Sequence, residues 1–244
     1  MGQHRNSNLL LESLPQPYRD SFTSRLEEVV LPAGTVLLEA EGVPRFAWFI
    51  TSGLASKMVS MSDGRSAEIA LWGSEGVVPC FHLLGGATQG PSRCIVQMET
   101  RALRMPFPEL QKEMQRSDAL RQLVLRCAQR CSMILSQNAA CNRLHDAEQR
   151  LARWLVTAHD LSGTSNILLS QVFLADILGA RRTTVTLAAG TLRRRKLISY
   201  RRGQIQILDH ERLKQVACEC YGTVNRLFED FYSEPEPQRA TPRR

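Results

Sequence analysis

The sequence predicts an α+β protein with three parts: a small β-sandwich or β-roll, a long helix and a C-terminal winged helix-turn-helix. Short β-type runs broken by Gly-rich turns extend from Val29 to Met105. After Pro106 the apolar spacing becomes helical, and a pair of helices followed by a β-like hairpin lies between Ser170 and Leu208. Strands grouped ahead of helices, instead of alternating with them, indicate the α+β class.

The N-terminal half contains the elements of the β domain. Residues 1–25 place apolar side chains among polar ones, which predicts one or two short helices. The predicted strands of the roll, over about 25–107, are Val29–Leu31, Thr35–Leu38, Ala47–Thr51, Leu54–Met61, Ala67–Trp72, Cys94–Met98 and Ala102–Met105. Asp63-Gly64 predicts a tight hairpin, because both central residues of such a turn favour positive φ.

A long helix is predicted over about 109–143. Its apolar residues recur at alternating intervals of four and three, the heptad spacing of helices that pack side by side. We expect this stripe to form the dimer seam: Leu120, Val124, Cys127, Cys131, Ile134, Asn138 and Cys141. A second stripe runs beside it: Leu125, Ala128, Ser132, Leu135 and Ala139. One stripe can pack on the β domain while the other meets a second copy, and a core helix of a single domain is the alternative.

The most specific pattern lies between Ser170 and Leu187. Ser170 is a suitable N-cap, and Ala175 is small enough for two helices to cross closely. Gly179 can adopt the positive φ that a tight interhelical turn requires, and Val185 then faces the first helix. Such a pair forms a helix-turn-helix, which places the N-terminal part of its second helix in the major groove of DNA.

A β-like hairpin completes a winged helix-turn-helix over about 169–208. Leu197–Tyr200 and Gln204–Leu208 flank two arginines and a glycine at the hairpin tip. The segment Arg181–Arg202 holds eight basic residues and no acid, in a chain of net charge +7. Such a block alone is usually a solvated face. Beside a helix-turn-helix and a wing, it predicts contacts with DNA phosphates.

Composition predicts two domains, 1–143 and 144–244, with a disordered tail at about 234–244. The chain has 244 residues, 43% of them hydrophobic, which is enough to bury sizeable cores.

The sequence contains no apolar run of membrane-spanning length and no apolar signal-peptide core at its N-terminus, so we expect a cytoplasmic protein without a membrane partner. Seven cysteines, an odd number, are expected to be mostly reduced thiols.

This order of elements resembles the CRP/FNR family of bacterial transcription regulators over residues 10–225. The most specific matches are Leu31–Thr35, Ser52-Gly53, Gly73–Gly86 and Leu178–Leu192. The resemblance implies a β-roll of the cyclic-nucleotide-binding type and a homodimer on a roughly two-fold symmetric site in double-stranded DNA. RNA polymerase and a small-molecule effector of unknown identity are further candidate partners.

The resemblance also implies an effector pocket between the roll and the long helix. Its expected residues are Gly76, Val78, Pro79, Cys80, Arg93, Cys94 and Ser136. In members that bind cyclic nucleotides, a Gly-Glu-Leu segment supplies a carboxylate to the ribose, and an Arg-Ser pair binds the phosphate. Here Val78–Phe81 offers no carboxylate and Cys94 replaces the serine. An unpaired ribose hydroxyl costs about 1–3 kcal/mol. Cyclic AMP is therefore not the expected effector, and a cyclic-nucleotide regulator with a degenerate pocket is the alternative.

The predicted recognition helix, about 181–193, departs from the Arg-Glu-x-x-x-Arg pattern of many members. Arg182 matches the first arginine, whereas Thr183 replaces the glutamate and Leu187 replaces the second arginine. The DNA site should therefore differ from the usual half-site. The expected base contacts are Arg181, Arg182, Thr183 and Thr186. The expected phosphate contacts are Ser170, Arg193, Arg201 and Arg202.

No cofactor, metal or catalytic site is expected. Iron–sulfur members use an N-terminal cysteine group, whereas the first cysteine here is Cys80. The seam cysteines are interpreted as small packing side chains, with a thiol sensor or intersubunit metal site as the alternative. Cys218-Glu219-Cys220 has no histidine or further cysteine at a supporting zinc spacing.

His82 is the one histidine of the β region. One histidine is too few to assign a haem site or a cupin-type enzyme, and the common catalytic motifs are missing from the sequence. A nonspecific DNA-compacting protein is a further alternative, recognised by binding that depends on salt and hardly on sequence.

Overall fold

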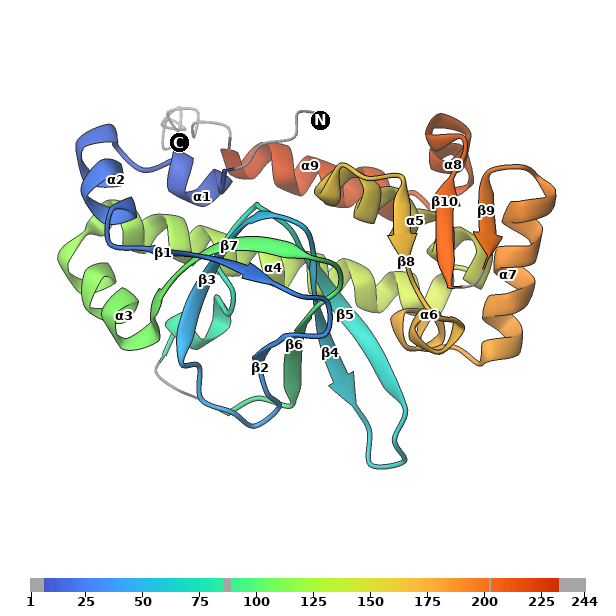
Figure 1. The fold of residues 1–244 in the computed structure, drawn as a ribbon, viewed down its shortest axis with the longest axis horizontal. Coiled ribbons are helices and arrows are strands. Elements are labelled where there is room, and N and C mark those ends of the chain that lie inside the picture. The colour runs from blue at the N-terminus through green and yellow to red at the C-terminus, as the bar shows by residue number, and fades with distance from the viewer. Residues whose placement is uncertain (1–6, 86–88, 202, 233–244) are drawn as a thin grey trace, which may run out of the picture.

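The computed structural model describes residues 7–85, 89–201 and 203–232. Two antiparallel sheets form the N-terminal half, a long helix runs behind them, and helices with a small sheet form the C-terminal half (Figure 1). The predicted α+β fold, with a roll, a long helix and a winged helix-turn-helix, is confirmed. The predicted disordered tail at 234–244 lies outside the described residues.

Two short helices open the described chain, α1 (Leu9–Glu12) and α2 (Gln16–Thr23). The Asn8 side chain caps α1 by accepting from the amide of Leu11 at 3.2 Å. Its Nδ2 also donates to the carbonyls of Ile50, at 2.9 Å, and Gly76, at 2.8 Å. One buried amide therefore fixes the N-terminal segment to two parts of the roll.

Seven strands form the roll: β1 (Glu27–Leu31), β2 (Val36–Leu38), β3 (Phe46–Ser52), β4 (Ala55–Ser60), β5 (Ser66–Trp72), β6 (Ser92–Val96) and β7 (Thr100–Pro106). One sheet has the order β1-β7-β3 and the other β2-β6-β4-β5. The predicted hairpin joins β4 and β5, with Gly64 at φ 83°. Asp63 does not have a positive φ, and its carboxylate accepts from the amide and Nε of Arg65. A 3₁₀ turn, η1 (Phe81–Leu83), follows β5.

Two helices replace the single helix predicted over 109–143. They are α3 (Phe107–Arg116) and α4 (Asp118–Leu144). Ser117 separates them because its backbone is extended, and its side chain caps α4 by accepting from the amide of Leu120 at 3.3 Å.

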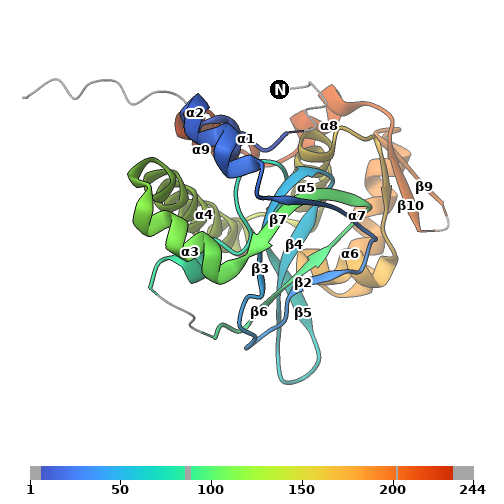
Figure 2. The same cartoon turned by 60° about the vertical axis from the view of Figure 1, so that its left-hand side comes forward.

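The C-terminal half contains α5 (Ala147–Ser162), β8 (Asn166–Leu168), α6 (Gln171–Leu178), α7 (Arg182–Arg194), β9 (Ile198–Arg201), β10 (Gln204–Ile207), α8 (His210–Val216) and α9 (Cys220–Tyr232). Its sheet has the order β8-β10-β9. After α8, the chain returns as α9 and lies along α4 (Figures 1 and 2).

Two apolar cores organise these elements. The first lies inside the roll and includes the inner face of α4. The second lies among α5, α6, α7 and the small sheet, and Leu54 of the roll joins it. Among the described residues, no helix is both long enough and apolar enough to cross a membrane.

Candidate nucleic-acid interface

α6 and α7 meet at the predicted tight turn. Ser170 caps α6, its Oγ accepting from the amide of Phe173 at 3.1 Å. Gly179 ends the helix at φ 56°, and the amide of Ala180 donates to the Ala175 carbonyl at 3.0 Å. Since a left-handed residue favours glycine, Gly179 suits the position where the chain reverses between the helices.

One face of α7 is buried and the other is exposed. The buried face consists of Val185, Ala188, Ala189 and Leu192, which pack in the second core. The four predicted base-contact residues all lie exposed at the start of the helix: Arg181, Arg182, Thr183 and Thr186. Leu187, which sequence reasoning left out of the site, is 70% exposed on the same stretch. An exposed leucine on a recognition helix can contact the methyl group of thymine.

A groove of about 390 Å³ runs between α7, the start of α6 and the wing. Its lining includes two predicted phosphate contacts, Ser170 and Arg193, together with Thr186 and Gly190 of α7. Tyr200 of the wing also lines it, and its hydroxyl donates to the Leu169 carbonyl at 3.3 Å. The groove therefore joins the helix face to the wing in one surface.

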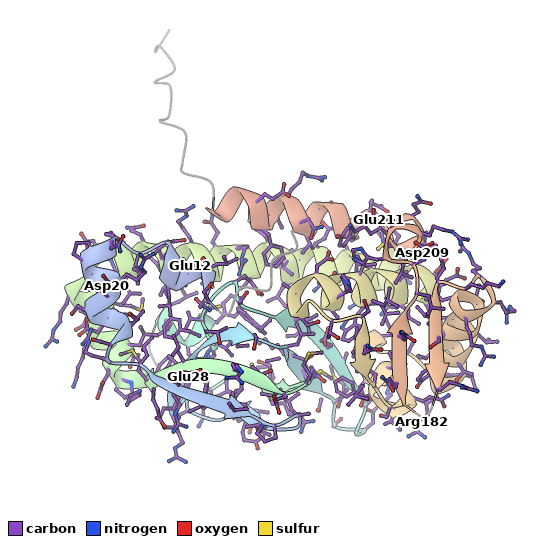
Figure 3. All side chains as sticks on the ribbon, turned by 45° about the horizontal axis from the view of Figure 1, so that its top comes forward. Glu12, Asp20, Glu28, Arg182, Asp209 and Glu211 are labelled. Carbon is purple, nitrogen blue, oxygen red and sulfur yellow. The ribbon has the colours of Figure 1, made fainter. Side chains whose placement is uncertain are left out.

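The wing is the β9–β10 hairpin, as predicted. Arg201 is exposed at the end of β9, and Gly203 adopts φ 77° beside it. Arg202, the fourth predicted phosphate contact, lies outside the described residues. Arg182 projects at the opposite end of this domain from Asp209 and Glu211 (Figure 3). The exposed start of α7 is thus kept apart from the acids of α8, which favours an anionic partner.

The helix-turn-helix is held against the roll. Arg150 of α5 donates to the Leu178 carbonyl at the end of α6. Trp154 of α5 donates to Glu68 of β5 at 2.7 Å, and Glu68 is buried there. α6 also packs on β5, so that a Cβ at Gly179 would lie 3.4 Å from that of Ala67.

The structure places the residues of the predicted effector pocket in different surroundings, and the pocket itself stays a prediction. Gly76 packs so tightly on α4 that a Cβ there would lie 2.6 Å from the sulfur of Cys127, and Val78, Pro79 and Cys80 are buried. Cys94 is buried, whereas its neighbour Arg93 points to the other face of β6, because side chains alternate along a strand. The charges of Arg182 and, more weakly, Arg93 reach Asp176 of α6. Ser136 is exposed, and its hydroxyl donates to the Ser132 carbonyl within α4.

The predicted dimer seam faces into the protomer. Leu120, Val124, Cys127, Cys131 and Cys141 are buried within a single chain, and Ile134 and Asn138 are partly covered. The roll and α9 pack against this stripe, where the seam prediction places a second copy. The second stripe remains open in part, with Leu125, Ser132 and Ala139 exposed, whereas Ala128 is buried and Leu135 is partly covered.

Four buried charged residues were missed by sequence reasoning: Glu68, Glu75, Glu113 and Arg130. Burial raises the pKa of the Glu68 carboxyl to about 7. Burial likewise raises the pKa of Glu75, although the nearby Arg130 charge opposes the shift. Arg130 also donates to the Glu75 carbonyl at 3.0 Å. Glu68 and Arg130 interrupt the apolar face of a strand and of a helix, which is a signal in the sequence, whereas Glu75 lies between Ser74 and Gly76 and has no such signal.

Comparison with known proteins identifies part of the chain. Residues 149–216 match the model of the Crp-like helix-turn-helix domain. No curated protein sequence matches the chain.

Solved structures match the fold over more than three quarters of this chain. A CRP-family transcriptional regulator from Thermus thermophilus is 17% identical, with a TM-score of 0.65 and coverage of 78% of this chain and 96% of that one. The c-di-GMP-responsive global regulator CLP of Xanthomonas campestris is 18% identical, with a TM-score of 0.62 and coverage of 79% and 99%. A second Thermus thermophilus regulator, of the CRP/FNR family, is 25% identical, with a TM-score of 0.53 and coverage of 78% and 98%. The predicted resemblance to the CRP/FNR family is confirmed.

Proposed function

We propose that this chain, which has a Crp-like helix-turn-helix domain and the fold of CRP/FNR transcription regulators, is a homodimeric regulator that binds a specific DNA sequence. The observation that carries the proposal is the exposed start of α7, with its arginines and threonines beside a groove that leads to the wing. An N-terminal helix end with exposed donors is the part of a recognition helix that enters the major groove. No step in this function requires catalysis by the protein.

The residues that contact bases are Arg181, Arg182, Thr183 and Thr186. Leu187 joins them because its side chain is exposed beside them. Arginine pairs with two acceptors of guanine, and leucine contacts a thymine methyl group. Ser170, Arg193 and Arg201 border the same surface and hold the phosphates, which fix the register of the protein on the duplex.

On this proposal, the exposed stripe of α4 packs against the same stripe of the second copy. Leu125 and Met133 are 38% and 48% exposed there, and Ser132, Ala139 and Ala140 are small exposed residues that let two helices approach closely. A two-fold axis across α4 brings the same residues of both copies together and orients the two DNA-binding domains for two half-sites.

An effector other than a cyclic nucleotide is favoured by the positions of Arg93 and Ser136. Arg93 is partly exposed on β6 and Ser136 is exposed on α4, whereas residues 76–80 are buried. An effector would act by biasing the contact between the roll and α5–α6, which requires different affinities for the two arrangements.

Replacing Arg182 with alanine tests the assignment of α7. Arg182→Ala is expected to weaken binding to the preferred site by about 1–3 kcal/mol and to relax specificity at one base pair. Arg193→Ala is expected to weaken binding to all DNA sequences alike. It should also reduce the slope of log affinity against log salt concentration by about one. Fluorescence anisotropy on the preferred site and on single-base variants, at several salt concentrations, measures both effects.

The matched control is Arg212→Ala, because Arg212 is exposed on α8 and lies 3.8 Å from Asp209, which Figure 3 shows at the opposite end of the domain from Arg182. Its affinity should stay unchanged. Equal losses for Arg182→Ala on every sequence would make Arg182 a phosphate contact, and full affinity in both α7 variants would contradict DNA binding by this helix.

A further inference from the structure

Four metal-binding side chains meet where the end of α4 touches the start of α9. Cys141 lies in the last turn of α4 and His145 caps that helix. Cys218 precedes α9, and Cys220 is its first residue. One donor atom from each of the four lies within 4.8 Å of all the others. Two short edges connect them: 3.5 Å between the sulfurs of Cys141 and Cys218, and 3.6 Å between the Cys220 sulfur and Nδ1 of His145.

These distances fit one tetrahedral metal ion. With Zn–S near 2.3 Å and Zn–N near 2.0–2.1 Å, a tetrahedron places two sulfurs about 3.8 Å apart and a sulfur and a nitrogen about 3.6 Å apart. The two short edges of the group lie close to these values. Three thiolates and one imidazole are also the donors that structural zinc sites use.

The three cysteines form a buried cluster of their own. Cys141, Cys218 and Cys220 are 0%, 4% and 1% exposed, and no aliphatic side chain belongs to the cluster. The other two cores of the described chain are built mainly from leucine, valine, isoleucine and aromatic residues. A cluster made only of thiols gains little from packing, and its composition indicates ligation instead.

Neighbouring side chains hold His145 and Cys220 in orientations that suit metal ligands. Nε2 of His145 lies 3.0 Å from the Glu219 carboxylate, while Nδ1 faces the cysteines. This is the carboxylate–histidine–metal arrangement, in which the carboxylate fixes the tautomer and the ring orientation. Gln137 Nε2 also donates to the Cys220 sulfur at 3.0 Å.

Positive charge lies near the group, because the charge of Arg153 reaches Cys141. Cys220 begins α9, where the helix dipole favours negative charge. Three thiolates around a divalent ion leave one net negative charge, which Arg153 can offset.

We propose that Cys141, His145, Cys218 and Cys220 bind one zinc ion, which fastens the start of α9 to the end of α4. α9 then runs back along α4 until Phe228 meets Arg130, whose guanidinium lies 4.6 Å from the ring centroid. The ion therefore joins the last helix of the DNA-binding half to the long helix that carries the proposed dimer surface.

Zinc content tests the proposal in the full chain. Protein loaded with zinc and then desalted is expected to retain about one ion per chain by mass spectrometry of the metal. Cys141→Ser and Cys220→Ser are expected to retain less than about a tenth of that amount, because each removes one of four ligands. Cys94→Ser is the matched control, a buried cysteine outside the group, and should retain the full amount.

Cobalt provides a second readout that does not depend on the variants folding. Co²⁺ added to the metal-free wild-type chain should give tetrahedral d–d bands and a thiolate-to-cobalt charge-transfer band, and equimolar Zn²⁺ should remove both. Zinc retained in Cys141→Ser would contradict the proposal by placing the ion elsewhere, for example among Cys80, Cys127 and Cys131. Absence of bound zinc and cobalt in the wild type, or a mass showing a Cys141–Cys218 disulfide in freshly purified protein, would also overturn it.

Discussion

The double substitution Leu125→Glu, Ala139→Glu is expected to convert the protein to a monomer and to weaken DNA binding by roughly 10²- to 10⁴-fold. Both positions are exposed on the same side of α4, two heptads apart. Across a two-fold axis each glutamate would face the same glutamate of the second chain. The substitution therefore places four carboxylates in the dimer interface. Like charges brought together in this way oppose association.

The loss of affinity follows from the loss of the second half-site contact. When two DNA-binding domains are joined, binding of the second is intramolecular, and separation of the copies removes that advantage. Light scattering during size-exclusion chromatography measures the mass, and anisotropy measures the affinity. Met61→Glu is the matched control, since Met61 is 56% exposed beside the β4–β5 turn. A double variant that stays dimeric would show that the copies meet elsewhere.

Glu68 is expected to make the protein less stable as the pH rises from about 5 to 8. Its carboxylate lies between the roll and α5, 2.5 Å from Ser56 Oγ and 2.7 Å from Trp154 Nε1. Burial raises its pKa from 4.5 to about 7, while the hydrogen bonds and the charge of Arg153 oppose the rise. In this position the neutral acid is favoured, because the charged form loses its hydration.

The sign follows from proton binding. Between pH 4.5 and 7 the folded protein holds a proton on Glu68 that the unfolded chain has released, so stability falls with rising pH. The full contribution is present below pH 4.5 and is lost as the pH passes 7; a shift of this size corresponds to on the order of 3 kcal/mol. Glu68→Gln should remove this slope, since glutamine can donate to Ser56 and accept from Trp154 at every pH.

Urea unfolding of the wild type and Glu68→Gln between pH 5 and 8 measures the difference. The two free energies of unfolding should be closest at pH 5, and the margin by which the glutamine variant exceeds the wild type should grow up to about pH 7 and then level off by pH 8. Parallel curves across this range would mean that Glu68 is ionised throughout, and that its burial costs little.

The DNA-binding unit was predictable because its signals are local. A serine cap, a small residue, a glycine four positions later and an apolar residue ten positions on fix two helices and their turn. The structure places Ser170, Ala175, Gly179 and Val185 in those roles. The wing was equally local, since two short strands flank one tight turn.

The surfaces of α4 were not predictable in the same way. A heptad stripe records that a helix packs against something, and the same spacing serves a second copy, a sheet or another helix. The packing of α9 determines which part of α4 stays exposed, because α9 comes from a segment far along the chain and covers part of α4. The expected effector pocket with Arg93 and Cys94 stays a prediction; on β6 the Cys94 side chain is buried and Arg93 is partly exposed.

The proposed zinc site was also invisible in local spacing. Cys218 and Cys220 have no further ligand nearby in sequence, and Cys141 and His145 lie more than seventy residues earlier. The spacing of four between Cys141 and His145 puts both on one side of a helix end. That pattern could have been noticed, but only the return of α9 along α4 brings it to the second pair.

Selection of binding sites from random double-stranded DNA, with the full chain at fixed salt, tests sequence-specific dimeric binding most directly. We expect an enriched two-fold symmetric sequence with half-sites about one helical turn apart. We also expect a guanine in each half-site that Arg182→Ala no longer selects. Enrichment of no sequence, with equal competition by unrelated DNA at the same salt, would contradict a specific regulator and indicate nonspecific binding.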